Sequence, residues 1–464
     1  MKRILTFAII IASTYTAYSQ SLGYNDIGIL FSKDDSFGTA RFEAMSGAFG
    51  ALGADVSAIS INPAGGAVAQ KSIFSATLNN RNTEFLASYY GTNTNTSDNY
   101  FNISQAGAIL SFDSANSSDW NRFSLNINYR LKSDFENSFS SRGNSGQALF
   151  NEHPDDTTNQ FDNGQEQRFT NTTIGESSIL EMGFSAVHQN KLFAGASIKF
   201  HRFRFGQVTR LRETNEDTNG NTLNALNIQD SFFEGNGISL SAGFIYKVNQ
   251  AFRFGLAYET PTWYPEVFEE SNLNVFDPNN ARYDDWLGYT DISASNQPTD
   301  VNSGEQFSSN IFKLRTPSRL TASAAIVFGK KGLISADYTY RDYSGTKFQE
   351  NDPVFITANQ NFVNDFKNAH SLNIGTEWRF DNMSIRGGYH FEESPFKNAL
   401  SKDHTKGYSL GLGYNFGDFK FDLAYRKSEN NSPYNIYNSP NVNVNPIELN
   451  NNTTRISGTI TFSL

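Results

Sequence analysis

One stretch decides the fold: residues 408–416 read Tyr-Ser-Leu-Gly-Leu-Gly-Tyr-Asn-Phe. Large apolar residues alternate with small or polar ones, so a β-strand here has one apolar face and one face of Gly, Ser and Asn. The alternation continues in Phe419, Phe421, Leu423 and Tyr425, and it returns at the C-terminus, over residues 455–464. This two-faced pattern predicts strands whose two sides meet different surroundings.

The same alternation recurs along the chain after about residue 70 and predicts about fourteen strands. An even number is typical of bacterial outer-membrane barrels, whose strands need about ten residues to cross the bilayer. The strands are expected near residues 72–90, 102–112, 120–135, 174–188, 191–212, 232–248, 250–260, 311–328, 331–341, 367–380, 382–393, 404–416, 418–428 and 452–464.

The predicted connections alternate between short and long. A closed up-and-down barrel has tight periplasmic turns and long external loops, so its connections must sort in this way. The short connections are 113–119, 188–190, 248–250, 329–332, 381–382 and 417–418. The long ones are 91–101, 136–173, 213–231, 261–310, 344–366, 394–403 and 429–451.

A soluble secreted β-sandwich or β-propeller is the alternative, because soluble strands also alternate. A soluble core would need two apolar faces packed together. Here the face opposite the aromatic residues carries charged side chains, namely Arg130, Lys199, Asp337, Glu377, Arg379, Asp422 and Arg426. We therefore expect an all-β transmembrane antiparallel barrel over residues 71–464, with a polar lumen and an aromatic girdle that includes Tyr338 and Tyr389.

The N-terminus has the features of an export signal. Lys2 and Arg3 precede an apolar run over residues 4–12, and the small residues Ala17 and Ser19 follow. This order is typical of a secretory signal peptide over residues 1–19, cleaved before Gln20. Beyond it no apolar run approaches the roughly 20 residues of a membrane helix, so a helical membrane protein is excluded and the predicted location is the outer membrane.

Residues 20–70 do not alternate and are rich in Gly and Ala. They end in the turn signal Asn62-Pro63-Ala64-Gly65 directly before the first predicted strand. Phe42, Met45, Phe49 and similar residues disfavour a disordered tail. We expect this segment to be a hatch that plugs the lumen.

Taken together, these features resemble the family of outer-membrane long-chain fatty-acid transporters, which includes channels for toluene and related hydrocarbons. The resemblance rests on the order of six segments across nearly the whole mature chain: Asn62-Pro63-Ala64, residues 314–323, residues 335–338, residues 385–395, and the late strands at 408–416 and 421–425. It implies a fourteen-stranded barrel with an N-terminal hatch and passive transport of a hydrophobic small molecule. In this mechanism the external loops capture the ligand, an interior pocket holds it, the hatch rearranges, and the ligand leaves sideways into the lipid.

The resemblance carries over only Asn62, Pro63 and Ala64, as the hatch motif. The long connection 261–310 offers further candidates, because aromatic and apolar side chains line most ligand pockets. The expected ligand contacts there are Trp263, Tyr264, Phe268, Trp286 and Leu287. Packing within the loop itself is the alternative role of these residues.

Composition excludes several other functions. The net charge of −10 disfavours nucleic acid as a partner, and the absence of cysteine removes disulfides and thiolate metal sites. The six His show no metal-ligand spacing, and no nucleotide-binding or nucleophile–base motif is present, so we expect no metal, no cofactor and no enzyme activity. Two alternatives to transport of hydrophobic ligands are left open: a barrel scaffold that docks exported proteins through loops 136–173 and 261–310, and a hydrophilic porin.

Overall fold

The computed structural model describes residues 22–114, 119–273, 290–302, 306–437 and 443–464. The predicted signal peptide and two predicted ligand contacts, Trp286 and Leu287, lie outside the described residues.

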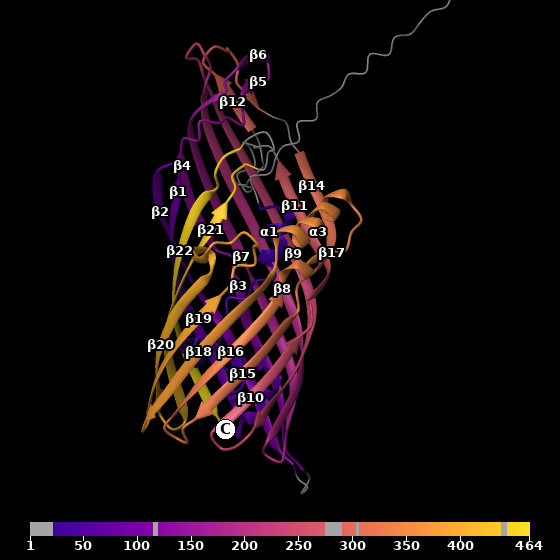
Figure 1. Cartoon of the computed structure of the whole chain (residues 1–464), viewed down its shortest axis with the longest axis vertical. Coiled ribbons are helices and arrows are strands. Elements are labelled where there is room, and N and C mark those ends of the chain that lie inside the picture. Colours follow the sequence, from indigo (N-terminus) through magenta and orange to yellow (C-terminus); the bar gives the residue numbers. More distant parts are fainter. Residues whose placement is uncertain (1–21, 115–118, 274–289, 303–305, 438–442) are drawn as a thin grey trace, which may run out of the picture.

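Fourteen antiparallel strands of the described chain close into a barrel (Figure 1). The first strand pairs with the last, from Ile73 opposite Ser463 to Ser88 opposite Glu448, so the wall has no open edge at the join. In order round the ring the strands are β1 (Ile73–Tyr89), β2 (Thr92–Asp113), β3 (Trp120–Asp134), β7 (Asn163–His188), β8 (Leu192–Glu216), β9 (Thr222–Lys247), β10 (Phe252–Glu259), β15 (Arg319–Val327), β16 (Gly332–Asp342), β18 (Asn368–Phe380), β19 (Met383–Glu392), β20 (Thr405–Asn415), β21 (Phe419–Tyr434) and β22 (Ile447–Ser463).

The two faces of the strands lie as the alternation predicts. In β20 the side chain of Leu410 is 56% exposed on the outside, whereas that of Ser409 is 1% exposed inside. Phe421, Leu423 and Ile456 on the neighbouring strands also face outward. The predicted membrane barrel of about fourteen strands is confirmed.

Several predicted loops are instead strands that extend past the apolar band. β7 and β9 have 26 residues each, far more than a membrane crossing requires. The predicted loop 91–101 is wrong: Tyr90 and Gly91 form a two-residue turn with positive φ at both positions, and β2 begins at Thr92. The alternation does not reveal this hairpin, because residues 92–99 at the start of β2 are polar on both faces.

The described residues of the predicted loop 261–310 are also largely β-structure, in β11 (Trp263–Leu273), β12 (Thr290–Ala294), β13 (Val301–Asn302) and β14 (Gln306–Arg315). Pro261 and Pro317 explain the breaks that separate β11 from β10 and β14 from β15, since proline has no N–H to donate to a ladder. The predicted single strand 311–328 is therefore two strands.

The remaining external connections carry small elements. These are β4 (Asn137–Gly143), which extends the sheet beside β7, β5 (Glu152–His153), β6 (Asp156–Gln160), η3 (Tyr343–Gly345), β17 (Lys347–Phe348), α3 (Pro353–Asp365) and η4 (Ser401–Asp403). No helix in the described residues is long and apolar enough to cross a membrane.

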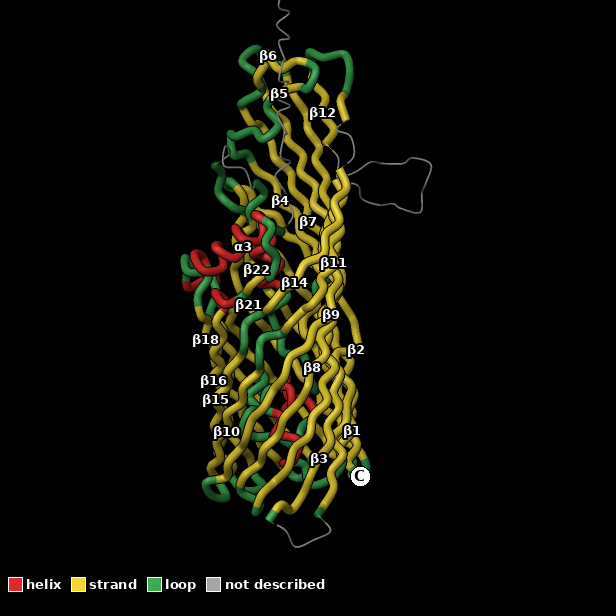
Figure 2. Tube along the Cα trace, turned by 90° about the vertical axis from the view of Figure 1, so that its right-hand side faces the viewer, coloured by secondary structure: helices red, strands yellow, loops and turns green. Residues whose placement is uncertain are grey.

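Residues 22–72, here called the pre-barrel segment, lie between the walls (Figure 2). They form α1 (Tyr24–Leu30), α2 (Ala40–Ala44), η1 (Val56–Ser60) and η2 (Pro63–Val68). Inward-facing side chains of the wall bond to their backbone: Asp337 accepts from the amides of Phe49 and Gly50, at 2.9 and 2.8 Å. Arg41 forms an ion pair with Glu377 at 2.7 Å.

Replacing Leu410 by Arg tests the position of the membrane. The side chain lies midway along β20 on the outward face, so Leu410→Arg should cost about 2–4 kcal/mol of folding free energy in lipid. Urea unfolding of the protein reconstituted in vesicles measures this cost. Leu400→Arg is the matched control, because Leu400 is similarly exposed, at 59%, but precedes η4 in an external connection. Equal losses in the two variants would contradict the assignment.

Candidate functional site

The lumen above the pre-barrel helices α2 and η2 contains an aromatic cluster built around α1. Phe31, at the end of α1, stacks on Phe203 of β8 with ring centroids 3.7 Å apart. Tyr24, at its start, packs edge-on against Phe312 and Phe348 at 5.8 and 5.7 Å. The buried members of this interior aromatic cluster are Ile27, Phe31, Phe135, Phe203, Phe205, Phe233, Tyr264, Val267, Phe312, Leu314, Tyr343, Phe348, Phe355, Ala358, Phe362, Phe366 and Ala369.

Helix α3 takes part in the wall beside this cluster. Over the described residues, β14 pairs with β11 along one edge. On the other edge it has only two ladder partners, Phe348 opposite Leu314 and Lys347 opposite Arg315. Helix α3 begins at Pro353, and Asp352 is its N-cap: the Asp352 side chain accepts a hydrogen bond from the amide of Val354. Among the described residues α3 packs mainly against β17, η3 and α1.

The inner face of α3 is apolar, and its outer face is mixed. Phe355, Ala358 and Phe362 are buried against the interior aromatic cluster. On the other side Val354 and Val363 are 44% and 61% exposed and lie among the exposed polar residues Thr357, Gln360 and Asn364.

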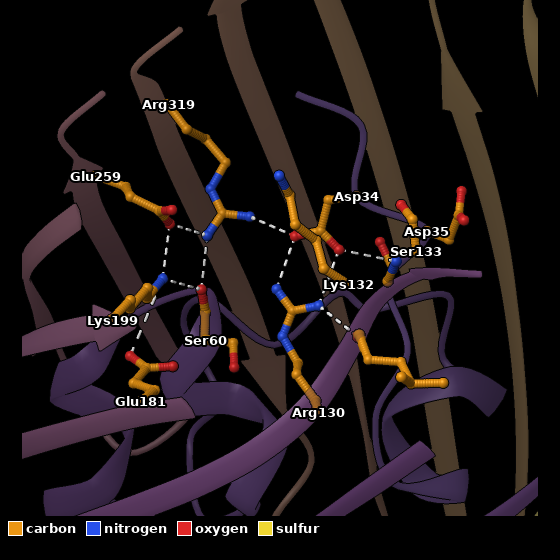
Figure 3. Close-up of polar contacts among 12 residues, drawn as sticks. Asp34, Asp35, Ser60, Arg130, Lys132, Ser133, Glu181, Lys199, Glu259 and Arg319 are labelled. Carbon is orange, nitrogen blue, oxygen red and sulfur yellow. Dashed lines mark hydrogen bonds and ion pairs between the residues drawn. The ribbon is translucent and has the colours of Figure 1, made fainter. Parts of the chain in front are cut away.

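A network of buried charges forms the floor below the cluster (Figure 3). Asp34 accepts two hydrogen bonds from Arg130, at 2.9 and 2.7 Å, and lies 3.7 Å from Arg319. Arg319 and Lys199 both donate to Glu259 at 2.6 Å and to the carbonyl oxygen of Ser60, at 2.6 and 3.1 Å. The network ties the pre-barrel segment to β3, β8, β10 and β15.

Asp34 is ionised in this setting. Burial alone would raise the pKa of its carboxyl, but the guanidiniums of Arg130 and Arg319 outweigh burial and hold the pKa well below its usual value. A depressed pKa stabilises the fold at every pH above the unfolded value near 4 and is lost only in stronger acid. This pair therefore makes a constant contribution between pH 5 and pH 8.

A second apolar cluster lies nearer the external mouth. Ile436 and Tyr437 pack against Phe85, Phe139, Phe169 and Leu211, and the Tyr437 hydroxyl bonds to Glu213. Gln207 marks the boundary with the lower cluster: its amide donates to Asn171 at 2.7 Å and to Tyr434 at 3.0 Å. The residues directly after β21, Ile436 and Tyr437, thus cover the interior from above.

The predicted external-loop contacts are divided by the structure. Tyr264 is buried in the interior aromatic cluster, 5.2 Å from the ring of Phe203. Trp263 and Phe268 lie on the same strand but face outward, at 41% and 39% exposed. These residues belong to β11, so the prediction that they form a loop is wrong, because the polar and aromatic sequence there continues the ladder with β9 and β14. Ligand contact by Tyr264 stays a prediction.

The predicted hatch motif packs against a part of the wall where β8 and β9 carry glycine, at Gly195 and Gly243. Asn62 caps η2 by accepting from the amide of Ala64, and its amide donates to the carbonyls of Gly50 and Phe244. A Cβ added at Gly195 would lie 2.6 Å from the carbonyl carbon of Pro63, so only glycine permits this approach. The motif thus positions the turn against β8 and β9.

Sequence reasoning missed the interior aromatic cluster, although residues 200–205 carried a signal for it. Phe200 faces outward, 40% exposed, whereas Phe203 and Phe205 face inward and are buried. Arg202 and Arg204 face out at this level, each 58% exposed. The apolar face therefore changes sides within β8, as expected where a strand leaves the lipid and its lumen becomes apolar.

No group of three or more His, Cys, Asp or Glu in the described residues has the geometry of a metal site. The arrangement defines a class of protein: a closed β-barrel, apolar outside, whose lumen is filled by its own leading segment beneath an aromatic interior. Such an interior can accept apolar molecules but offers little to hydrated ions.

Solved structures share this architecture. The chain is similar to a FadL homologue from Pseudomonas aeruginosa, with a TM-score of 0.58 and 12% identity over 93% of this chain and 99% of that chain. It is also similar to the toluene transporter TbuX of Ralstonia pickettii, with a TM-score of 0.51, 16% identity, and 94% and 100% of the two chains covered. For the toluene transporter TodX of Pseudomonas putida the values are 0.50, 15%, 93% and 99%.

The resemblance to the fatty-acid and hydrocarbon transporter family is thereby confirmed at the level of the fold. No family model matches the sequence, and no curated protein matches it.

Breaking the Asp34–Arg130 pair should destabilise the protein strongly. Arg130→Met leaves a buried carboxylate with only the more distant Arg319, which costs about 3–5 kcal/mol of unfolding free energy. The double variant Asp34→Asn/Arg130→Met should recover much of this loss, because it removes the charge left unpaired. Urea unfolding in vesicles measures both.

Lys402→Met provides the matched control, because it removes an exposed ion pair with Glu448. We expect an unchanged unfolding midpoint. A double variant as unstable as Arg130→Met alone would show that the charge network is not what holds Asp34.

Proposed function

We propose that this protein is a passive transporter of hydrophobic small molecules, long-chain fatty acids or hydrocarbons, in the bacterial outer membrane. One observation carries the proposal: above the charged floor the lumen of a barrel, which is ordinarily polar, is lined by buried aromatic side chains. The names of the similar structures, two of them toluene transporters, support the same ligand class. Export by a cleaved signal peptide over residues 1–19 belongs to the same proposal.

The ligand enters from the external mouth and displaces aromatic side chains of the chain itself. Tyr24 and Phe31 of the pre-barrel segment are part of the interior aromatic cluster. A ligand that replaces their contacts therefore competes with the packing that holds α1 in place. In this proposal residues 20–70 act as the hatch, and release of α1 is the step that loosens them. No energy source beyond the concentration gradient is required.

The ligand leaves sideways past α3. This helix packs beside the edge of β14 that has few ladder partners, and its inner face is apolar. Moving α3 breaks few backbone hydrogen bonds, whereas opening two fully paired strands would break many. The cluster lies above the apolar band, so a ligand that passes here reaches the lipid from its outer surface.

A reversible lock between α1 and α3 tests this mechanism. The side chains of Asn25 and Asn361 meet with Oδ1 and Nδ2 3.2 Å apart, and the chain has no cysteine of its own. In Asn25→Cys/Asn361→Cys, oxidation should reduce uptake of labelled oleate or toluene into liposomes at least tenfold, and reductant should restore it.

The two single-cysteine variants are the controls and should transport equally with and without reductant. Full uptake by the oxidised double variant, with the disulfide confirmed by mass spectrometry, would exclude movement of α1 against α3. Absence of uptake by the unaltered protein, for both compounds, would refute the transport proposal itself.

A further inference from the structure

Three basic side chains in the lumen lack the partners that such groups usually have. Arg426 of β21, Arg455 of β22 and His390 of β19 are 8%, 6% and 4% exposed. No carboxylate among the described residues lies within 4 Å of either guanidinium. By contrast, the lumenal guanidiniums of Arg130 and Arg386 each have a carboxylate oxygen at 2.7 Å.

The barrel register brings the three residues together. Arg426 stands directly opposite Arg455 in the ladder between β21 and β22. Strand β20, between β19 and β21, contributes Gly407, where an added Cβ would lie 2.5 Å from the Cε1 atom of His390. Glycine thus leaves room for the imidazole, and the charges of Arg426 and Arg455 both act on His390.

Five nitrogen atoms of this group have no hydrogen-bond partner in the described structure. They are Nε and Nη1 of Arg426, Nη1 of Arg455, and both ring nitrogens of His390. Arg455 is otherwise held in place, because its Nη2 donates to the carbonyl of Asp35 at 2.8 Å and its guanidinium lies 4.3 Å from the ring centroid of Phe37. Buried donors left unpaired are costly, and a bound ion or water is a common explanation.

No acid of the described residues forms an ion pair with either guanidinium. Asp35 is paired with Lys33 at 3.1 Å. Glu43 accepts from the Ser457 hydroxyl and the Gly38 amide. Glu43, Asp35 and Glu392 act on Arg426 only at longer range. Two guanidiniums that face each other without an intervening acid favour an anion between them.

We propose that Arg426, Arg455 and His390 form a binding site for one small monovalent anion, a halide or a carboxylate. The anion would join β19, β21 and β22 and, through Arg455, would hold residues 35–37 of the pre-barrel segment against the wall. This site is separate from the interior aromatic cluster and does not depend on the transported compound.

Anion-dependent stability tests the proposal in the full-length protein in detergent. Unfolding midpoints in urea are compared in sodium chloride, bromide, acetate and gluconate at equal ionic strength. We expect the midpoint to rise with the concentration of the two halides, of acetate, or of all three anions. Gluconate is the reference, because it is bulkier than the other anions. A response to halides alone assigns an inorganic anion, and a response to acetate assigns a carboxylate. Identical midpoints in all four salts would overturn the proposal.

Arg426→Met and Arg455→Met should abolish the difference between salts. Arg202→Met, an exposed arginine of β8 paired with Glu234, is the matched control and should keep it. If the lumenal variants do not fold, crystals of the unaltered protein grown in bromide decide the matter. An anomalous peak between the two guanidiniums supports the site, and its absence refutes a halide site.

Discussion

Charged and polar groups that face the lumen need partners, and the rest of this structure depends on that constraint. The wall turns its apolar side chains to the lipid, so Asp337, Arg130 and Glu377 point into the lumen, where they are buried. The pre-barrel segment supplies their partners through backbone amides, Asp34 and Arg41. Its packing inside the barrel therefore follows from the polarity of the wall as much as from its own apolar residues.

The lumen changes character where the strands leave the lipid. Below this level many of its side chains are polar and bonded to the pre-barrel segment, with smaller apolar clusters such as that of Phe193 and Ile245. Above it, Phe203 and Phe205 turn inward while Arg202 and Arg204 turn to solvent. Outside the membrane the protein is organised like a soluble one, with its apolar groups buried together, and this places the interior aromatic cluster directly above the charged floor.

Much of the barrel could be predicted from sequence, because a period of two with lipid on one side leaves a clear pattern in β20 and β22. The outer parts of the strands could not, since residues 92–99 are polar on both faces and resemble a loop. The interior aromatic cluster depends on contacts between residues far apart in sequence, such as Phe31 with Phe203, and no local pattern encodes these. The chemistry of Tyr264 predicts a ligand contact, but only the fold shows that this side chain faces inward while Trp263 faces outward.

The length of β7, β8 and β9 has a consequence for where the protein meets its surroundings. Strands of 25 or 26 residues extend on the order of 80 Å at about 3.3 Å per residue, against an apolar band roughly 25 Å tall. On the side of the barrel formed by these three strands, the rim consequently lies well beyond the lipid surface. A molecule that contacts the rim is therefore held far from the lipid headgroups.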